Sequence, residues 1–233
     1  MVPAYQAAPW VAGVIRGVLE LELELEPGSP GGPSLLVIDD GSDDGTADAA
    51  REAGAEVLRL AENRGKGHAL RFAFKTLFDR GFDAVITLDA DGQHQPTEIP
   101  KLIGCWRESG ADLVLGTREH LFAGMSPVRR FANTLSSRII SRVAGQMMLD
   151  IQTGFRLYTR RLIESTGFPE DRFEAESAVV VRALRQGLSI ATVPIDLARV
   201  DGRSSSHYRP LVDSARIARA VTRARLERGQ SAA

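Results

Sequence analysis

The chain has 233 residues, a formal net charge of −1, 43% hydrophobic residues and a single cysteine, Cys105. This length suits one large α/β domain or two small ones, the small net charge gives no global field for nucleic acid, and one cysteine excludes an intramolecular disulfide. Because no run approaches the roughly 18 apolar residues that span a bilayer, and the start lacks a signal-peptide pattern, we expect a cytoplasmic protein.

Strand-like apolar runs alternate with helical patterns through the first half of the chain. A partial strand at residues 2–5 precedes predicted strands at residues 34–38, 56–60, 84–88 and 112–116. Helical patterns lie between them, at residues 8–25, 46–53, 65–77 and 96–108. This alternation predicts an α/β fold of parallel βαβ units with right-handed crossovers.

One stretch of the first predicted helix is ambiguous. Residues 20–26 alternate Glu and Leu, which is a strand-like period, yet both residue types favour helices. We therefore predict that they form the end of the helix 8–25. The Pro- and Gly-rich residues 27–33 are a predicted loop.

The second half is less regular and becomes basic at its end. We expect a helix at residues 127–145, a loop leading into a strand at 150–158, a helix at 174–186 and a strand at 189–195. Residues 209–228 then carry six arginines against Asp213 and Glu227, with apolar residues at helical spacing. Such a helix either lies on an anionic membrane surface or docks on its own domain. We expect one domain at residues 1–208, followed by this helix and a tail at 209–233.

A pair of aspartates ends the predicted strand at residues 84–88. Asp89 and Asp91 follow its apolar residues directly, and Gly92 comes next. Two carboxylates one residue apart can converge on Mg²⁺ or Mn²⁺, which take oxygen ligands and leave positions open for phosphate. The alternative interpretation is a polar strand exit with Gly92 supplying the turn.

Other charged residues are expected at the same edge of the sheet. In open α/β sheets, ligands bind beyond the carboxyl ends of the strands. Besides the aspartate pair, that edge is predicted to carry Asp39, Asp40 and Arg118.

Taken together, these stretches resemble the family 2 glycosyltransferases, which have the GT-A fold, a mainly parallel Rossmann-like sheet flanked by helices. The nearest branch is that of dolichol-phosphate mannosyltransferase and related polyprenyl-phosphate glycosyltransferases. The resemblance covers most of the chain. The residues that carry it are Val2-Pro3-Ala4-Tyr5, Val37 to Thr46, Asn63-Arg64-Gly65-Lys66-Gly67, Asp89-Ala90-Asp91-Gly92-Gln93-His94, Gly116-Thr117-Arg118, Thr153-Gly154-Phe155-Arg156, Val193-Pro194-Ile195, Arg199 and Gly202.

The resemblance implies a metal-dependent inverting transferase that uses a nucleoside diphosphate sugar. It assigns the divalent cation to Asp89, Asp91 and Gln93, and it makes Ala90 the small residue that lets the nucleotide approach. The cation would neutralise the leaving diphosphate as a Lewis acid. The nucleoside would be held by Pro3, Tyr5, Ile38 and Asp40, and the phosphates or the acceptor by Arg118, Arg130 (or Arg129) and Arg199.

The acceptor decides whether a general base is needed. A hydroxyl acceptor requires a carboxylate to take its proton, whereas a lipid phosphate is already an anion. Asp150 is the first choice on the acceptor side, so Asp91, acting through the cation, and Asp150 are the catalytic candidates. Glu174 and Glu176 are late alternatives that can instead simply begin a helix. Gly65-Lys66-Gly67 either contacts phosphate at a helix start or fixes a turn.

Several positions depart from the family pattern. Gln6-Ala7 replaces an Asn-Glu pair, Gly202-Arg203-Ser204-Ser205 lacks the usual lysine, and the first strand is short enough to suggest a start downstream of the natural one. These departures leave both GDP-mannose and UDP-sugars open as donors. We expect a polyprenyl phosphate acceptor met at a membrane surface. The alternatives are a soluble transferase acting on a hydroxyl, a nucleotidyltransferase and an inactive sugar-nucleotide binding protein.

Overall fold

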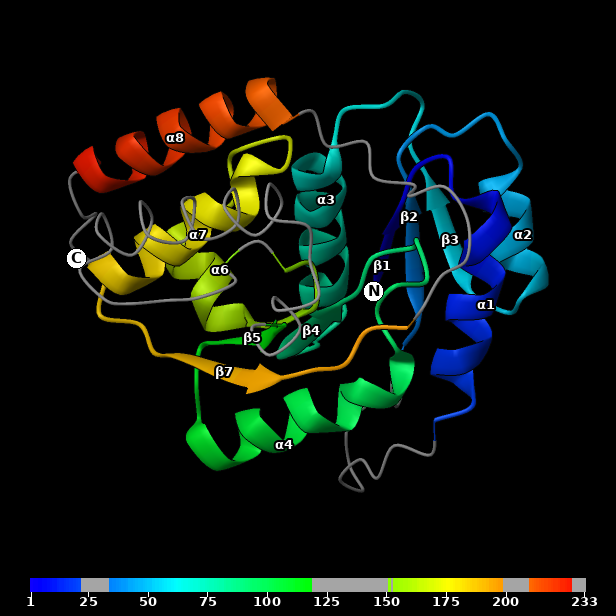
Figure 1. Ribbon diagram of the computed structural model, residues 1–233, viewed down its shortest axis with the longest axis horizontal. Helices are drawn as coiled ribbons and strands as arrows, with labels where there is room; N and C mark the ends of the chain where they lie inside the picture. The colour runs from blue at the N-terminus through cyan, green and yellow to red at the C-terminus, as the bar shows by residue number, and fades with distance from the viewer. Residues whose placement is uncertain (22–33, 119–150, 152, 199–209, 228–233) are drawn as a thin grey trace.

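A computed structural model describes residues 1–21, 34–118, 151, 153–198 and 210–227 of the chain (Figure 1). A parallel sheet has the order β1-β2-β3, formed by β1 (Val2–Ala4), β2 (Leu36–Asp39) and β3 (Glu56–Arg59). A second sheet has the order β4-β6-β5-β7, formed by β4 (Ala84–Thr87), β6 (Arg156–Thr159), β5 (Leu113–Thr117) and β7 (Ile190–Pro194).

The two sheets meet edge to edge at Met1. Its carbonyl accepts the N–H of Leu88 at 3.3 Å, and its amino group donates to the carbonyl of Ile86 at 2.8 Å. The strands therefore follow one another in space as β3-β2-β1-β4-β6-β5-β7. This arrangement places the carboxyl ends of β1, β2 and β4 side by side.

Helices cover both faces of this combined sheet (Figure 1). One face carries α1 (Ala8–Leu19), α2 (Thr46–Glu52) and α4 (Ile99–Ser109), the last preceded by the 3₁₀ turn η1 (Pro96–Glu98). The other face carries α3 (Lys66–Asp79), α6 (Arg160–Thr166) and α7 (Glu174–Arg185), with α8 (Pro210–Leu226) outside α7.

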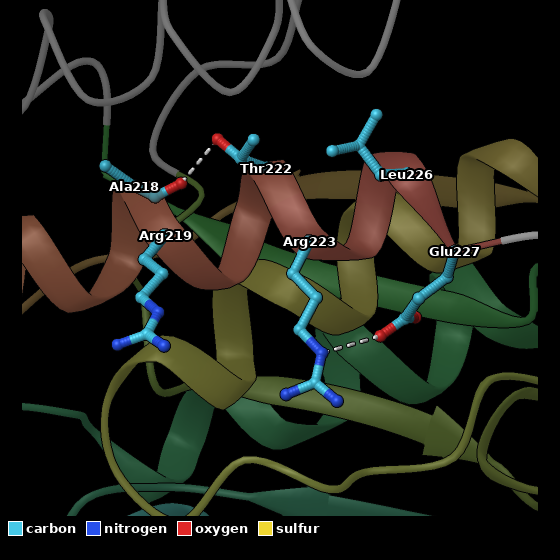
Figure 2. A pocket seen from close by; sticks show the side chains of 6 residues that line it. All are labelled: Ala218, Arg219, Thr222, Arg223, Leu226 and Glu227. Carbon is cyan, nitrogen blue, oxygen red and sulfur yellow. Dashed lines mark hydrogen bonds and ion pairs between the residues drawn. The ribbon is translucent and has the colours of Figure 1, made fainter.

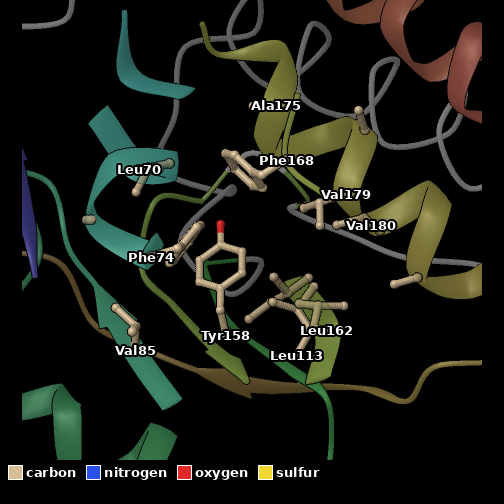
Figure 3. Packing of buried hydrophobic residues seen from close by; sticks show 14 of the residues in the cluster. Leu70, Phe74, Val85, Leu113, Tyr158, Leu162, Phe168, Ala175, Val179 and Val180 are labelled. Carbon is tan, nitrogen blue, oxygen red and sulfur yellow. The ribbon is translucent and has the colours of Figure 1, made fainter. Parts of the chain in front are cut away.

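Alternation along the strands separates two cores. Leu36 and Ile38 of β2 face the α3–α7 side, whereas Val37 between them faces the α1–α4 side. Both sides of the sheet are thus apolar, as expected for a sheet covered by helices on both faces. On the α3 side, the ring of Phe74 lies 4.9 Å from that of Tyr158 and 5.2 Å from that of Phe168 (Figure 3). These rings fasten α3 to β6 and to the loop before α7.

The prediction of a mainly parallel α/β sheet is confirmed, and one strand runs the other way. β6 is antiparallel to both of its neighbours, β4 and β5. The side chain of Arg156, fully buried at the start of β6, explains how the chain enters this strand. It donates to the carbonyls of Ile151 at 2.5 Å, Thr153 at 2.7 Å and Glu176 at 2.6 Å, and so ties the entering loop to α7.

Element boundaries differ from the sequence-based predictions in two places. The first helix was predicted to reach residue 25, but α1 ends at Leu19; Glu20 and Leu21 are already non-helical, and residues 22–33 lie outside the described part. The short helix α6 was not predicted. It is capped by Thr159, whose hydroxyl accepts the N–H of Leu162 at 3.2 Å. The predicted helix at 127–145 also lies outside the described residues.

The basic helix α8 is docked on α7. Ile217, Val221 and Ala224 are at least 94% buried along its inner face. Arg182 of α7 donates to Glu227 at 2.8 Å and is also paired with Glu170. Within the described part of the chain, no helix has both the length and the hydropathy of a membrane span.

Candidate functional site

The loop after β4 brings the predicted metal-binding residues together. Asp91 accepts the backbone N–H of Gln93 at 3.0 Å and its side-chain amide at 2.9 Å. Partial burial and the nearby charge of Asp89 both raise the pKa of Asp91. The two carboxylates therefore repel each other, which is the electrostatic situation that a divalent cation relieves.

His94 closes this loop. Its Nδ1 accepts the backbone N–H of Asp89 at 3.2 Å, and its ring stacks on Phe155 with 5.4 Å between centroids. The imidazole is only 3% exposed. The sequence left the role of His94 open, and in the structure it holds the backbone of Asp89 in place.

Lys66 forms an ion pair with the first aspartate of the pair. Its ammonium lies 2.6 Å from Oδ1 of Asp89 and 3.1 Å from Oε1 of Glu176, and its side chain is 14% exposed. Burial alone would lower the pKa of Lys66, yet the two carboxylates raise it above its usual range. Burial raises the pKa of Asp89, but Lys66, His94 and Arg118 together outweigh this effect and hold it at about 2. Both partners are therefore charged at neutral pH.

Glycines allow the close approaches that build this arrangement. At Gly154, an added Cβ would lie 2.6 Å from Oδ1 and 2.7 Å from Cγ of Asp89. Gly65 has φ of +106°, and a Cβ there would meet the carbonyl oxygen of Asp171 at 2.6 Å. A side chain at either position would push the surrounding loops apart.

Asp40 shapes the loop that precedes Lys66. Its carboxylate accepts the backbone N–H of Arg64 at 3.0 Å and that of Gly65 at 2.7 Å. It is 3% exposed, and burial raises its pKa. This carboxylate therefore fixes the start of α3, and its predicted contact with a nucleotide base stays a prediction.

The other predicted residues are distributed around this edge. Pro3 lies in β1 opposite Ile38 of β2, and Tyr5 follows β1 directly. Ile38 is fully buried in the core, and Ala90 is 6% exposed beside the aspartates. Arg118 follows β5, and its charge lowers the pKa of both Asp89 and Asp91, which places it near them. Asp150, Arg129, Arg130 and Arg199 lie outside the described residues.

The donor set fits a hard divalent cation that shares its coordination with a ligand. Asp89, Asp91 and Gln93 offer oxygens from one short loop, and such sparse sites are completed by waters and substrate phosphates. Among the residues that the structure describes, no three His, Cys, Asp or Glu side chains gather into a metal cluster. Asp89, Asp91 and Gln93 would thus supply only part of the coordination sphere of a cation at this loop.

The ion pair between Lys66 and Glu176 was not predicted from the sequence. Lys66 was expected to contact phosphate or to fix a turn, and Glu176 was an alternative acceptor-side carboxylate that could instead begin a helix. Glu176 lies in the first turn of α7, 5% exposed, and 110 positions separate it from Lys66 (176 − 66). The local sequence offers one indication, a lysine between two glycines. This pattern indicates that other backbone lies close to residues 65–67, but it does not identify Glu176 as the ion-pair partner of Lys66.

A hollow of about 650 Å³ lies elsewhere, along α8 (Figure 2). It is lined by Ala218, Arg219, Thr222, Arg223, Leu226 and Glu227, none of which belongs to the sheet edge that carries Asp89. In Figure 2, Arg219 and Arg223 extend on the same side of the helix, and Arg223 pairs with Glu227 at 3.6 Å. This hollow is a surface groove on a basic helix.

Relatives of known name resemble most of the chain. Glycosyltransferase AglJ of Haloferax volcanii is 31% identical over 219 residues, which cover 91% of this chain and 67% of the relative. The undecaprenyl-phosphate mannosyltransferase of Micrococcus luteus is 32% identical, covering 69% of this chain and 70% of the relative. The polyprenol monophosphomannose synthase of Mycolicibacterium smegmatis is 30% identical, covering 69% and 65%.

Solved structures share the fold. Glucosyl-3-phosphoglycerate synthase from Mycobacterium tuberculosis, in complex with Mn²⁺, UDP and phosphoglyceric acid, has a TM-score of 0.70 at 20% identity and covers 96% of this chain and 75% of that one. Mannosyl-3-phosphoglycerate synthase from Rubrobacter xylanophilus has a TM-score of 0.70 at 23% identity, covering 96% and 71%. The fold is therefore the GT-A fold of glycosyltransferases.

The model of glycosyl transferase family 2 matches residues 1–167, which include β1 to β6, the aspartate pair and Lys66. This match covers well over half of the chain and agrees with the relatives named above. The chain belongs to glycosyl transferase family 2 and is a glycosyltransferase.

Proposed function

We propose that this enzyme is a metal-dependent inverting transferase that moves a sugar from a nucleoside diphosphate sugar to a polyprenyl phosphate. The observation that carries the proposal is the pair Asp89 and Asp91, held at the carboxyl end of β4 with Gln93 and with Arg118 nearby. Relatives named for undecaprenyl-phosphate and polyprenol acceptors support the choice of acceptor.

Each residue of the loop has a role in this reaction. Asp89, Asp91 and Gln93 would hold the cation, Mn²⁺ or Mg²⁺, which when bound supplies Lewis-acid neutralisation of the leaving diphosphate. His94 holds the backbone of Asp89, and Ala90 keeps the turn small. The guanidinium of Arg118 adds a fixed positive charge beside the carboxylates, where charge develops on the phosphates.

The nucleoside side of the site is assigned to the ends of β1 and β2. Pro3, Tyr5 and Asp40 follow one another along that edge, with Ile38 in the core behind. We further assign Arg130 and Arg199 to the phosphates or the acceptor by their match to the family motifs. Both GDP- and UDP-sugars remain candidate donors.

A lipid phosphate acceptor makes a general base unnecessary. The phosphate monoester is an anion at neutral pH, so its oxygen can attack the anomeric carbon without losing a proton first. Asp150 is then an acceptor-side carboxylate that positions the incoming group. If the acceptor is a hydroxyl, Asp150 becomes the general base instead.

The test is transfer from UDP- and GDP-sugars with Mn²⁺, measured with and without a polyprenyl phosphate. We expect transfer to the lipid that requires the cation, and a loss of at least about a hundredfold in Asp91→Ala because the leaving charge is no longer neutralised. Asp48→Ala, an exposed carboxylate on α2 that pairs with Arg51, is the matched control and should retain full activity.

Two outcomes would contradict the proposal. If neither UDP- nor GDP-sugars bind in a cation-dependent way, the proposed metal-dependent mechanism is wrong. Turnover on a water-soluble hydroxyl acceptor, with none on the lipid phosphate, would contradict the proposed acceptor but not the proposed metal site.

A further inference from the structure

Lys66 fills a position beside Asp89 that three elements build together. The lysine is the first residue of α3, Asp89 follows β4, and Glu176 lies in the first turn of α7. Its ammonium is 2.6 Å from Asp89 and 3.1 Å from Glu176, whose side chain is 7% exposed. Lys66 therefore differs from a flexible surface lysine, because its ammonium is largely buried and lies close to two carboxylates.

The surroundings hold the lysine in place. Gly67 lies against the 170–171 backbone, because a Cβ there would be 2.8 Å from the carbonyl carbon of Asp171. The N–H of His68 donates to the carbonyl of Asp171 at 2.9 Å, and the carbonyl of Glu176 accepts from buried Arg156. The start of α3 is thereby fastened to the loop before α7, which places Lys66 beside both Asp89 and Glu176.

The contact between Lys66 and Asp89 affects how Asp89 could bind a cation. Oδ1 of Asp89 already has a positive partner, and a divalent cation at that oxygen must compete with it. Among the described residues, the nearby charges are Asp89, Asp91 and Glu176 against Lys66, Arg118 and Arg156, the last of which lies 3.9 Å from Glu176: three negative and three positive, a sum of zero. A hard cation is held weakly by so little net charge and needs the oxygens of a diphosphate as well.

We propose that Lys66, anchored by Glu176, is a positioning residue that competes with the divalent cation for Asp89 and so makes cation binding depend on the nucleotide. This inference rests on the proposed metal-dependent function. When cation and diphosphate arrive together, Asp89 exchanges the ammonium for the metal, and the ammonium keeps Glu176 as its partner. Without the nucleotide the exchange is unfavourable.

The experiment separates this competition from a simple effect of net charge. Lys66→Met with Glu176→Gln removes one positive and one negative charge, so the sum is unchanged while the competitor of Asp89 is gone. Neither Lys66 nor Glu176 is left as an unpaired buried charge, and Arg156 keeps its three carbonyl partners, which protects folding. Mn²⁺ binding is measured by electron paramagnetic resonance, without nucleotide and with saturating UDP or GDP, and circular dichroism checks the fold.

We expect the double variant to bind Mn²⁺ alone about tenfold more tightly than the wild type. With the nucleotide present the difference should shrink, because the diphosphate already drives the exchange in the wild type. Glu176→Gln alone should weaken nucleotide-free Mn²⁺ binding. Of its two carboxylate partners Lys66 then keeps only Asp89, so it should compete more strongly with the cation there. Lys75→Met, an exposed lysine on the same helix that pairs with Asp79, should change nothing.

Equal or weaker nucleotide-free Mn²⁺ binding in the folded double variant would overturn the inference and make Lys66 a structural link only. Failure of the proposed function looks different. In that case the wild type itself shows no Mn²⁺ binding that responds to UDP or GDP, and Asp91→Ala changes nothing.

Discussion

At the residue scale, the Asp89 carboxylate can take its position because residue 154 is a glycine and has no side chain. Gly154, in the loop before β6, leaves room for this carboxylate, and the hydroxyl of Thr87 donates to the Gly154 carbonyl at 2.9 Å. The backbone of a loop 65 positions away thus forms one wall of the proposed metal site (154 − 89). The geometry of Asp89 is set from outside its own loop.

Gly154→Ala should displace Asp89 and damage activity more than stability. The new Cβ would lie 2.7 Å from Cγ of Asp89, so the carboxylate must move. A shift of this size in a catalytic group lowers kcat/KM by about a hundredfold, and Mn²⁺ binding should weaken in parallel.

Gly104→Ala is the control for this substitution. It lies inside α4 with nothing within 4 Å of the added Cβ, so it should leave kcat/KM unchanged and stabilise the fold by up to about 1 kcal/mol. Wild-type activity in Gly154→Ala would contradict this prediction, because it would show that the Asp89 carboxylate can move aside without loss of function.

At the element scale, Arg156 fastens the start of the antiparallel strand β6 to the loop before it and to α7. Its guanidinium is fully buried and satisfies three carbonyls from the loop and from α7. Arg156→Met keeps the apolar stem but leaves those carbonyls without a donor. We expect a loss of about 3 kcal/mol or more in the free energy of unfolding, measured by urea denaturation. A loss below about 1 kcal/mol would mean that water takes over the three bonds.

A second element-scale prediction concerns how α8 is held on α7. Glu227 pairs with Arg182, and this contact lowers the pKa of Glu227. A lowered carboxyl pKa contributes stability that is fully present above the unfolded value of about 4.3 and is lost as the pH falls through the folded value. Glu227→Gln should therefore be less stable than the wild type at pH 7, and the two should converge below about pH 4.

The urea midpoint of both proteins, followed from pH 7 to pH 3, measures this convergence. Glu164→Gln is the control, because this carboxylate on α6 is exposed and lies 3.8 Å from Arg160. A constant difference between Glu227→Gln and the wild type across the whole range would rule out the ion pair as the cause.

At the scale of the whole molecule, α8 carries an exposed basic face. Ile217, Ala220, Val221 and Ala224 are used in docking on α7, while Arg216, Arg219, Arg223 and Arg225 are exposed. We propose that this face meets an anionic membrane that carries the lipid acceptor. Docking and surface binding use different sides of one helix, so the two interpretations offered by the sequence are compatible.

Liposome sedimentation tests this proposal. Arg219→Ala with Arg225→Ala should reduce binding to phosphatidylglycerol vesicles by about thirtyfold, since each surface arginine contributes roughly 1 kcal/mol near an anionic leaflet. Binding to phosphatidylcholine should be weak in both proteins. Arg51→Ala on α2, at the far side of the molecule in Figure 1, is the control. Unchanged binding of the double variant to anionic vesicles would remove α8 from the membrane contact.

The fold and the acidic edge of the sheet could be predicted because their signals are local. An apolar run followed by Asp89 and Asp91 shows both the strand and its polar end within a few residues, and the same holds for β2 with Asp39 and Asp40. The antiparallel direction of β6 could not be predicted, because it is defined by pairing with β4 and β5, which are distant in the sequence. Lys66 and Glu176 meet only through the packing of α3 on α7, which no local pattern encodes.

The long sequence separation between Lys66 and Glu176 also determines when the site is completed during synthesis. A nascent chain that has just released residues 83–95 from the ribosome holds the whole aspartate loop, but neither Gly154 nor Glu176 exists yet. Its two carboxylates then face water, and Lys66 has one of its two partners. Only when α7 emerges can α3 be fastened and the ammonium fixed between Asp89 and Glu176. The last third of the chain therefore converts an acidic loop into a site with a defined charge.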